Sequence, residues 1–341
     1  MRPTRPLALL LAPTLALAAC GLSGCDPSPS VDAEEAPLTG TFDVTSRFEV
    51  PATVAAPGPL GDALRLVHGL ALDPGTAILD LAEEAGVPAL AELRLVLPDA
   101  LEAELTGWMN EYLETATVGG LSPHDRIEEL DAVIRSVLLT WELRSTLDLP
   151  AGSGGTHAPV AIAFDTPAGP VVVPVDATAP VTAGVDVVAT ISWPDGPQGD
   201  AVASIGDHAM GIPFGRYALR GLDAILLAQH GSADLRAFLA DAVGCETLAA
   251  SVAGRCLGPI CVGHETELLA VCEGGLDQAA ARIEAQVLGL DFQAIHFQQG
   301  TATAEVTPAP AVVALQDGVW TATIDLGQGA EAATATFSAV R

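Results

Sequence analysis

Four cysteines in the second half of the chain have a symmetrical spacing that favours disulfide chemistry. Cys245, Cys256, Cys261 and Cys272 are separated by ten, four and ten residues. The symmetry predicts a helical hairpin, because eleven residues make almost three turns at about 3.6 residues per turn, so both cysteines of a helix face its partner. Two cysteines of one helix would stand about 16.5 Å apart, beyond the roughly 7 Å limit for a disulfide. The hairpin therefore predicts the nested pairs Cys245–Cys272 and Cys256–Cys261.

Two further cysteines follow a predicted export signal. Arginines precede an apolar run of 13 residues, Leu7 to Ala19, which ends in Leu17-Ala18-Ala19-Cys20. These four residues resemble the lipobox of bacterial lipoproteins, in which the cysteine is acylated and becomes the new amino terminus. We expect acylation at Cys20, which directly follows the apolar run, with Cys25 as the alternative. An ordinary secretory signal is the competing interpretation, whereas 13 residues are too few to span about 30 Å of hydrocarbon.

A metal site is the competing interpretation of the four distal cysteines. Zinc sites usually contain short C-x2-C pairs, which are missing here. Thiolate ligands would also compete with oxidation outside the cell, so we favour disulfides. The spacing is similar to that of twin-cysteine helical hairpins, although those usually have nine residues where this chain has ten. That resemblance implies no shared function.

Two polar segments are weak candidates for a site. Asp207 and His208 lie between glycines, where we favour a turn in which Asp207 accepts backbone hydrogen bonds. His264 and Glu267 share a helical face but supply too few ligands for a metal, so we favour a solvated helix start. The motifs of serine hydrolases, zinc proteases, dinucleotide-binding proteins and EF-hands are absent. We therefore predict no catalytic residue, no metal site and no cofactor.

The charge balance excludes several classes of partner and mechanism. The chain has 14 basic and 43 acidic residues and a formal net charge of −29, and loss of Arg2 and Arg5 with the signal would make it −31. Such an acidic balance argues strongly against binding to nucleic acid, and it argues against docking on anionic headgroups. The chain contains no lysine, which excludes a Schiff-base enzyme and a Walker-type phosphate loop.

The remaining residues divide into a tether and a folded body. Residues 1–19 are the predicted signal peptide, and residues 20–38 are the lipidated cysteine and a flexible tether with three prolines. Residues 39–341 are expected to form a single α+β body, with two separate domains as the alternative. Alternating apolar residues predict half-exposed strands at 42–50, 141–149, 185–193 and 320–326, with weaker ones at 301–306 and 335–341.

Two segments between these strands have helical spacing. They are predicted as helical insertions near 59–138 and 214–288, with Ser122 capping a helix in the first and Ser232 capping one in the second. Strands with one exposed face are typical of antiparallel sheets. We therefore expect an antiparallel sheet or an open barrel-like meander with two helical insertions, one of them a disulfide-stapled hairpin.

The chain also resembles uncharacterised lipoproteins from GC-rich, myxobacteria-like genomes. The resemblance lies in Gly40-Thr41-Phe42, residues 206–222, the Cys245 region and Gly318-Val319-Trp320, and it implies no known activity. The sequence predicts an envelope lipoprotein held by its N-terminal lipid on a bacterial membrane, in the outer membrane or facing the periplasm. It would be a non-enzymatic interaction module for an envelope protein, or a binder of a small apolar ligand. The alternative is a divergent exported hydrolase that uses Asp207, His208 or the His264 segment.

Overall fold

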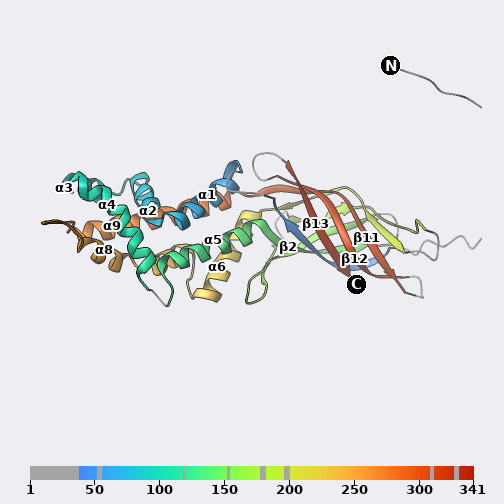
Figure 1. Cartoon of the computed structure of the whole chain (residues 1–341). Helices are drawn as coiled ribbons and strands as arrows, with labels where there is room; N and C mark the ends of the chain where they lie inside the picture. The colour runs from blue at the N-terminus through green and yellow to red at the C-terminus, as the bar shows by residue number, and fades with distance from the viewer. Residues whose placement is uncertain are drawn as a thin grey trace, which may run out of the picture. The chain divides into compact units, whose positions relative to one another are not determined.

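The structure is a computed structural model that describes residues 38–51, 56–117, 120–151, 154–176, 182–195, 200–307, 311–325 and 330–341. Cys20 and Cys25 lie outside these residues, as do the predicted signal peptide and most of the tether. The described part confirms the α+β class, with a large antiparallel sheet that is not closed and a helical hairpin joined by a disulfide (Figure 1).

The sheet contains 11 strands within the described residues, and these strands pair in antiparallel fashion. Along its main path the order is β4-β3-β2-β1-β13-β12-β11-β7-β6, while β5 pairs with β3 and β8 pairs with β11. The strands are β1 (Gly40–Glu49), β2 (Thr140–Leu149), β3 (Gly155–Phe164), β4 (Val171–Pro174), β5 (Val185–Val187), β6 (Ala189–Ser192), β7 (Ala201–Ile205), β8 (His208–Ile212), β11 (Phe292–Val306), β12 (Val312–Asp325) and β13 (Ala330–Val340).

Two expectations about the strands need correction. The strand predicted at 185–193 is two short strands, β5 and β6, which pair with different neighbours. The turn predicted around Asp207 is limited to Gly206 and Asp207, because His208, Met210 and Ile212 alternate inward and form β8.

The helices form two groups, one between β1 and β2 and the other between β8 and β11. The first group is α1 (Gly58–Leu72), α2 (Pro74–Glu84), α3 (Pro88–Val96), α4 (Asp99–Thr115) and α5 (Pro123–Leu139). The second is α6 (Phe214–His230), α7 (Leu235–Val243), α8 (Cys245–Ala253) and α9 (Glu265–Leu288).

The helix starts follow local capping chemistry. As predicted, Ser122 caps α5, and it forms a capping box with Asp125. The prediction for α7 was wrong, because its cap is Asp234, whose carboxylate accepts from the Ala237 amide 2.8 Å away. Ser232 Oγ is buried and has no hydrogen-bond partner among the described residues. A carboxylate two residues later therefore replaces the expected hydroxyl cap.

Helix α9 is the central element of the helical part. It packs against α1, α2, α3, α6, α7 and α8, while α5 contacts β2 and α6 contacts β3 and β4. Trp141 of β2 stacks on Phe48 at 4.4 Å and lies 4.9 Å from Phe214 at the start of α6. These buried rings make one continuous hydrophobic core between the sheet and the helices.

The described body has two opposite ends, one where the chain enters at β1 and one that carries a short hairpin between α8 and α9. Strand β1 begins at Gly40, opposite Leu149, and ends beside Thr140, which directly follows α5. The chain therefore enters the body at the end of the sheet remote from α5. At the other end, α8 and α9 are joined by a short hairpin of β9 (Cys256–Leu257) and β10 (Ile260–Cys261), and the 24-residue α9, about 36 Å long, runs from this hairpin back toward β11 (Figure 1).

Candidate functional site

A chain of hydrogen bonds between side chains crosses the interior of the sheet. Ser145 Oγ of β2 lies 2.7 Å from His157 Nε2 of β3, and His157 Nδ1 lies 2.8 Å from His208 Nε2 of β8. His208 Nδ1 in turn lies 2.8 Å from the Gly206 carbonyl oxygen. This series of hydrogen bonds therefore links three strands, including β3 and β8, which are not paired with each other in the sheet.

The direction of these hydrogen bonds follows from the last acceptor. A carbonyl oxygen cannot donate, so His208 Nδ1 carries a proton and donates to Gly206. In a neutral His208 the Nε2 atom must then accept from His157 Nδ1–H, and His157 Nε2 must accept from the Ser145 hydroxyl. With both rings neutral, every ring nitrogen in the chain has a partner of the correct kind.

The surroundings hold both rings in the neutral form. Burial lowers the pKa of His157 to about 3, and the neighbouring His208 adds to the shift. Burial also lowers the pKa of His208, against the opposing effects of the Gly206 carbonyl and the Asp207 carboxylate. Phe297 and Trp320 pack against both imidazoles, with ring centroids between 4.8 and 6.0 Å apart. An extra proton in this apolar site is therefore unfavourable.

The burial of these hydrogen-bonded side chains determines what chemistry they can do. A serine hydroxyl 2.7 Å from an imidazole has the spacing of a nucleophile and its base. However, Ser145 is only 3% exposed and His157 only 1%, so a substrate cannot reach the serine in this conformation. We interpret the chain as a structural link inside the sheet.

The predicted weak candidates do not come together into one site. His208 is buried on β8, whereas Asp207 is exposed and lines a surface hollow of about 410 Å³ with Asp148, Asp186 and Thr156. His264 and Glu267 lie at the start of α9, where His264 Nδ1 is 3.8 Å from Glu267 Oε1 and both side chains are partly exposed to solvent. Within the described ranges, no group of three or more potential ligands could hold a metal ion.

Both predicted disulfides are present. Cys245–Cys272 joins the start of α8 to α9 with a Cα–Cα distance of 5.7 Å, and Cys256–Cys261 closes the hairpin between these helices. Two disulfides indicate an oxidising compartment and therefore an exported protein. None of the described helices is long and apolar enough to span a bilayer.

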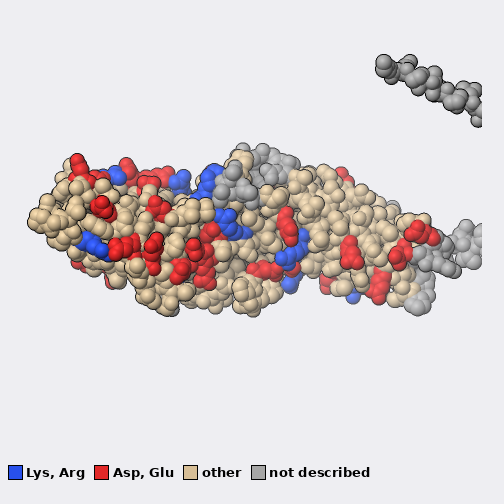
Figure 2. Space-filling model, viewed as in Figure 1, with Lys and Arg blue, Asp and Glu red and all other residues tan. Residues whose placement is uncertain are grey.

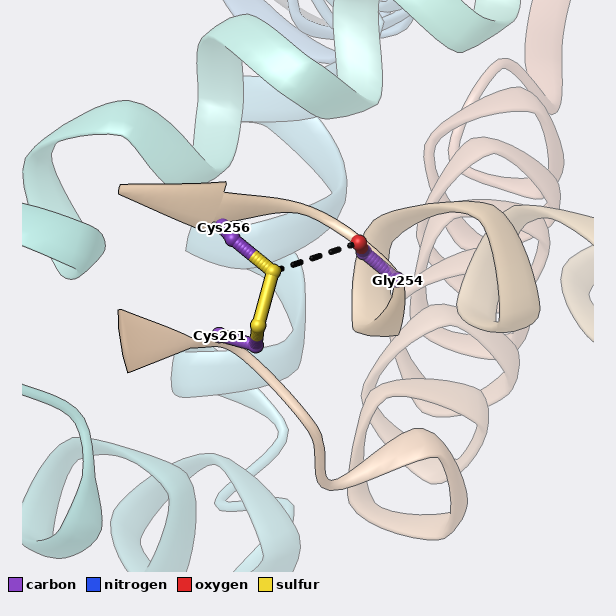
Figure 3. Close-up of a disulfide and its surroundings, with 3 residues drawn as sticks. All are labelled: Gly254, Cys256 and Cys261. Carbon is purple, nitrogen blue, oxygen red and sulfur yellow. Dashed lines mark hydrogen bonds between the residues drawn. A yellow bond between two sulfur atoms is a disulfide. The ribbon is translucent and has the colours of Figure 1, made fainter. Parts of the chain in front are cut away.

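The position of the outer pair differs from the expectation. Cys256 and Cys261 were expected on the helices, but α8 ends at Ala253 and α9 begins only at Glu265. The two cysteines instead face each other across the β9–β10 hairpin (Figure 3). Gly258 and Gly263 adopt positive φ angles, which allow the chain to turn within the hairpin and again just before α9.

The β9–β10 hairpin, residues 256–261, is hereafter called the tip. All six residues are exposed, and Leu257 and Ile260 are 48% and 51% exposed. No charged residue occurs between Arg255 and His264. In Figure 2 the end of the molecule that bears the tip shows neutral surface, in contrast to the acidic residues along the helices. The tip is therefore an apolar, disulfide-closed projection on an acidic protein.

Sequence reasoning missed Ser145 and His157, although a signal for them existed. The alternation in β2 places residues 141, 143, 147 and 149 inward, so residue 145 must also point inward despite being serine. Ser46 breaks the alternation of β1 in the same way, and its hydroxyl accepts from Trp320 Nε1 at 3.0 Å. In both strands, a serine at an inward position therefore indicated a buried hydrogen bond.

Comparisons with protein-family models, with curated proteins and with solved structures found no match to this chain.

Proposed function

We propose that this protein is a lipid-anchored envelope protein that acts by binding another envelope protein through its tip. The N-terminal sequence supports the anchor, with Cys20 as the acylated residue and Cys25 as the alternative. The disulfides agree with the oxidising environment that such an anchor implies.

The observation that carries this proposal is the construction of the tip. Leu257 and Ile260 are held at a fixed separation by the Cys256–Cys261 bond and by direct pairing of the two strands. At the base, the Val262 amide donates to the Arg255 carbonyl at 2.9 Å, and the Gly263 amide donates to the Ala253 carbonyl at 3.0 Å. A rigid apolar projection loses little conformational entropy on binding, which favours recognition of an apolar surface.

The location of the tip supports the same role. The chain enters the body at the end of the sheet remote from α5, whereas the tip lies at the far end of α9. An anchor upstream of β1 would therefore be attached at the end of the body remote from the tip. The acidic body disfavours adhesion to anionic lipid, so a protein surface is the partner that suits the tip best.

The packing of the interior favours this role over the binding of an apolar ligand. The largest fully buried side chains are Trp141, Trp320 and six phenylalanines, and they fill the core. A surface hollow of about 300 Å³ between α5, α6 and the turn after β3 is flanked by Glu129 and Asp165. The hydrolase alternative is not favoured by the pair of Ser145 and His157, because both residues are buried.

The anchor is tested by expressing the full chain in a bacterium that acylates lipoproteins and labelling the cells with alkyne-tagged palmitate. We expect incorporation that is lost in Cys20→Ala and retained in Cys25→Ala. Mass spectrometry of the mature N-terminus checks the cleavage position. An unacylated mature chain would overturn the anchor, and loss of label only in Cys25→Ala would move it.

The contact is tested by placing a photo-crosslinking amino acid at Leu257 in the full chain in its native envelope. Leu227 of α6 is the matched control, because it is also an exposed leucine, at 58% against 48% for Leu257. We expect a discrete cross-linked envelope protein from position 257 and none from position 227. Equal cross-linking from both positions, or none from position 257, would contradict the proposed contact.

A further inference from the structure

The two disulfides differ in their access to solvent. Cys245 and Cys272 are 7% and 1% exposed and belong to the hydrophobic core between α8 and α9. Cys256 and Cys261 are both exposed at the tip. Exchange with an external thiol requires the attacking sulfur to reach the disulfide directly. Only the outer disulfide meets this requirement in the folded protein.

Cleavage of the outer disulfide would change only the tip. The two hydrogen bonds at its base, from Val262 to Arg255 and from Gly263 to Ala253, do not involve the sulfur atoms. The inner disulfide would continue to join α8 to α9. The six residues of the tip therefore form a unit that can lose its cross-link while the helices keep their positions.

In the reduced form, one of the two thiols also has a hydrogen-bond acceptor within reach. Cys256 Sγ lies 3.7 Å from the Gly254 carbonyl oxygen (Figure 3). A disulfide sulfur carries no hydrogen and cannot donate, whereas a free Cys256 thiol can donate to this oxygen. The local backbone thus accommodates the thiol without rearrangement.

From access, local independence and this acceptor, we propose that Cys256–Cys261 is a thiol–disulfide exchange site whose co-substrate is an exported protein dithiol. The donor thiolate attacks one sulfur of the tip, a mixed disulfide forms, and the other cysteine leaves as a thiolate that takes a proton from water. The second donor thiolate then attacks the mixed disulfide and releases the remaining cysteine. Two electrons pass to the tip, and the donor becomes a disulfide.

This inference goes beyond partner binding and does not depend on it. Exchange would free Leu257 and Ile260 from their fixed arrangement, and reoxidation would restore it. The inner disulfide, which the core covers, stays oxidised throughout and serves as an internal reference within the same molecule.

The experiment treats the oxidised full chain with dithiothreitol under native conditions, followed by acid quenching, alkylation and peptide mass spectrometry. We expect Cys256 and Cys261 to be alkylated at least about 100-fold faster than Cys245 and Cys272, because the inner pair must await local unfolding. In the Cys256→Ser/Cys261→Ser variant only the slow phase should remain. Reduction of both pairs in parallel, or of the tip only in denaturant, would overturn the proposal.

Two further arms test the nature of the donor. Glutathione, a monothiol, should reduce the tip less completely than a dithiol, because the freed tip cysteine can attack the mixed disulfide and expel glutathione again. Reduced thioredoxin, used as a protein dithiol, should yield two free thiols at the tip and become oxidised in equal amount. If thioredoxin leaves the tip oxidised while dithiothreitol reduces it, a protein dithiol is not the co-substrate. None of these readouts involves the cross-linking assay, so each proposal can fail separately.

Discussion

Ser145, His157 and His208 show how burial determines the chemistry of polar groups in this protein. The Ser145 hydroxyl and the His157 ring are buried, and with both imidazoles neutral each ring nitrogen has a partner of the correct kind. A protonated His208 would have to donate through Nε2, which would force His157 to donate toward Ser145 instead. The hydrogen bonds could therefore be satisfied in either case, and it is burial that favours the neutral state of both rings.

Acid should destabilise the protein through this pair of histidines. Both have a pKa in the folded chain below the ordinary value of 6.5, so the unfolded state binds more protons once the pH falls below it. The contribution of His157 is complete above about pH 6.5 and is lost progressively toward its folded pKa of about 3. At pH 5 the loss from His157 should reach about 2 kcal/mol.

Urea denaturation at pH 7 and pH 5 measures this loss in a range where ordinary carboxyl groups stay ionised. His157→Gln should show a clearly smaller difference between the two pH values than the native chain. His264→Gln, which changes an exposed histidine, should keep the full difference. An unchanged difference in His157→Gln would disprove the assignment.

The buried serines allow a matched test of hydrogen bonding. Ser145→Ala leaves His157 Nε2 without a donor, and Ser46→Ala leaves Trp320 Nε1–H without an acceptor. Each should lower the free energy of unfolding by about 1–3 kcal/mol. Ser232→Ala removes an equally buried hydroxyl with no partner among the described residues and should be nearly neutral. Equal losses in all three variants would show that packing, not hydrogen bonding, determines the cost.

At the scale of elements, close contacts of α9 organise the helical part. A Cβ atom at Gly275 would lie 2.4 Å from the Ile78 carbonyl oxygen, and one at Gly274 would lie 2.5 Å from a methyl group of Val87. Helix α2 and the start of α3 thus approach the backbone of α9 at a pair of glycines. Side-chain volume at these two positions is incompatible with the observed packing.

Alanine substitution of a crowded and of an uncrowded helical glycine should change the free energy of unfolding in opposite directions. Gly275→Ala should lower the free energy of unfolding by about 1–3 kcal/mol, because backbone atoms must move. Gly107→Ala in α4 meets nothing within 4 Å and should raise it by up to about 1 kcal/mol through helix propensity. Thermal or urea denaturation of both variants checks the pair, and stabilisation by Gly275→Ala would contradict the described packing.

The sequence predicted the elements that have clear periods and missed those without them. Helices from Gly58 to Leu139 and from Phe214 to Leu288 follow the predicted helical segments closely. Strand β3 was missed because its last four residues are all buried and its pairing with β2 shifts register at Val160, so it lacks regular alternation. The end of α8 before Cys256 was missed because cysteine spacing alone does not reveal where glycines stop a helix.

At the scale of the whole molecule, the two disulfides should differ in their contribution to stability. Cys245–Cys272 closes a loop with a sequence separation of 27, against 5 for Cys256–Cys261. The chain-entropy relation gives about 3.5 kcal/mol for the inner bond and about 2 kcal/mol for the outer one. Denaturation of Cys245→Ala/Cys272→Ala and Cys256→Ser/Cys261→Ser under oxidising conditions measures both, and a greater loss in the outer variant would contradict this order.

The candidate sites were predictable to different degrees. Disulfide pairing followed from spacing, because only nested pairs suit an antiparallel hairpin. The chain of Ser145, His157 and His208 could not be assembled from sequence, because β3 and β8 come together only through the curvature of the sheet and through strands contributed by distant segments. Exposure of the tip likewise depends on where the helices end.

The pairing of β1 with β13 has a consequence for the order in which the protein is made. Thr45 lies opposite Ser338, so the first strand of the body needs a partner from its last. During N-terminus-first synthesis and export, β1 emerges early, and its pairing with β13 must wait until almost the whole chain has followed. Closing so long a loop is slow, whereas the helices between β1 and β2 make local contacts and can form earlier. We therefore expect the pairing of β1 with β13 to be among the last contacts to form.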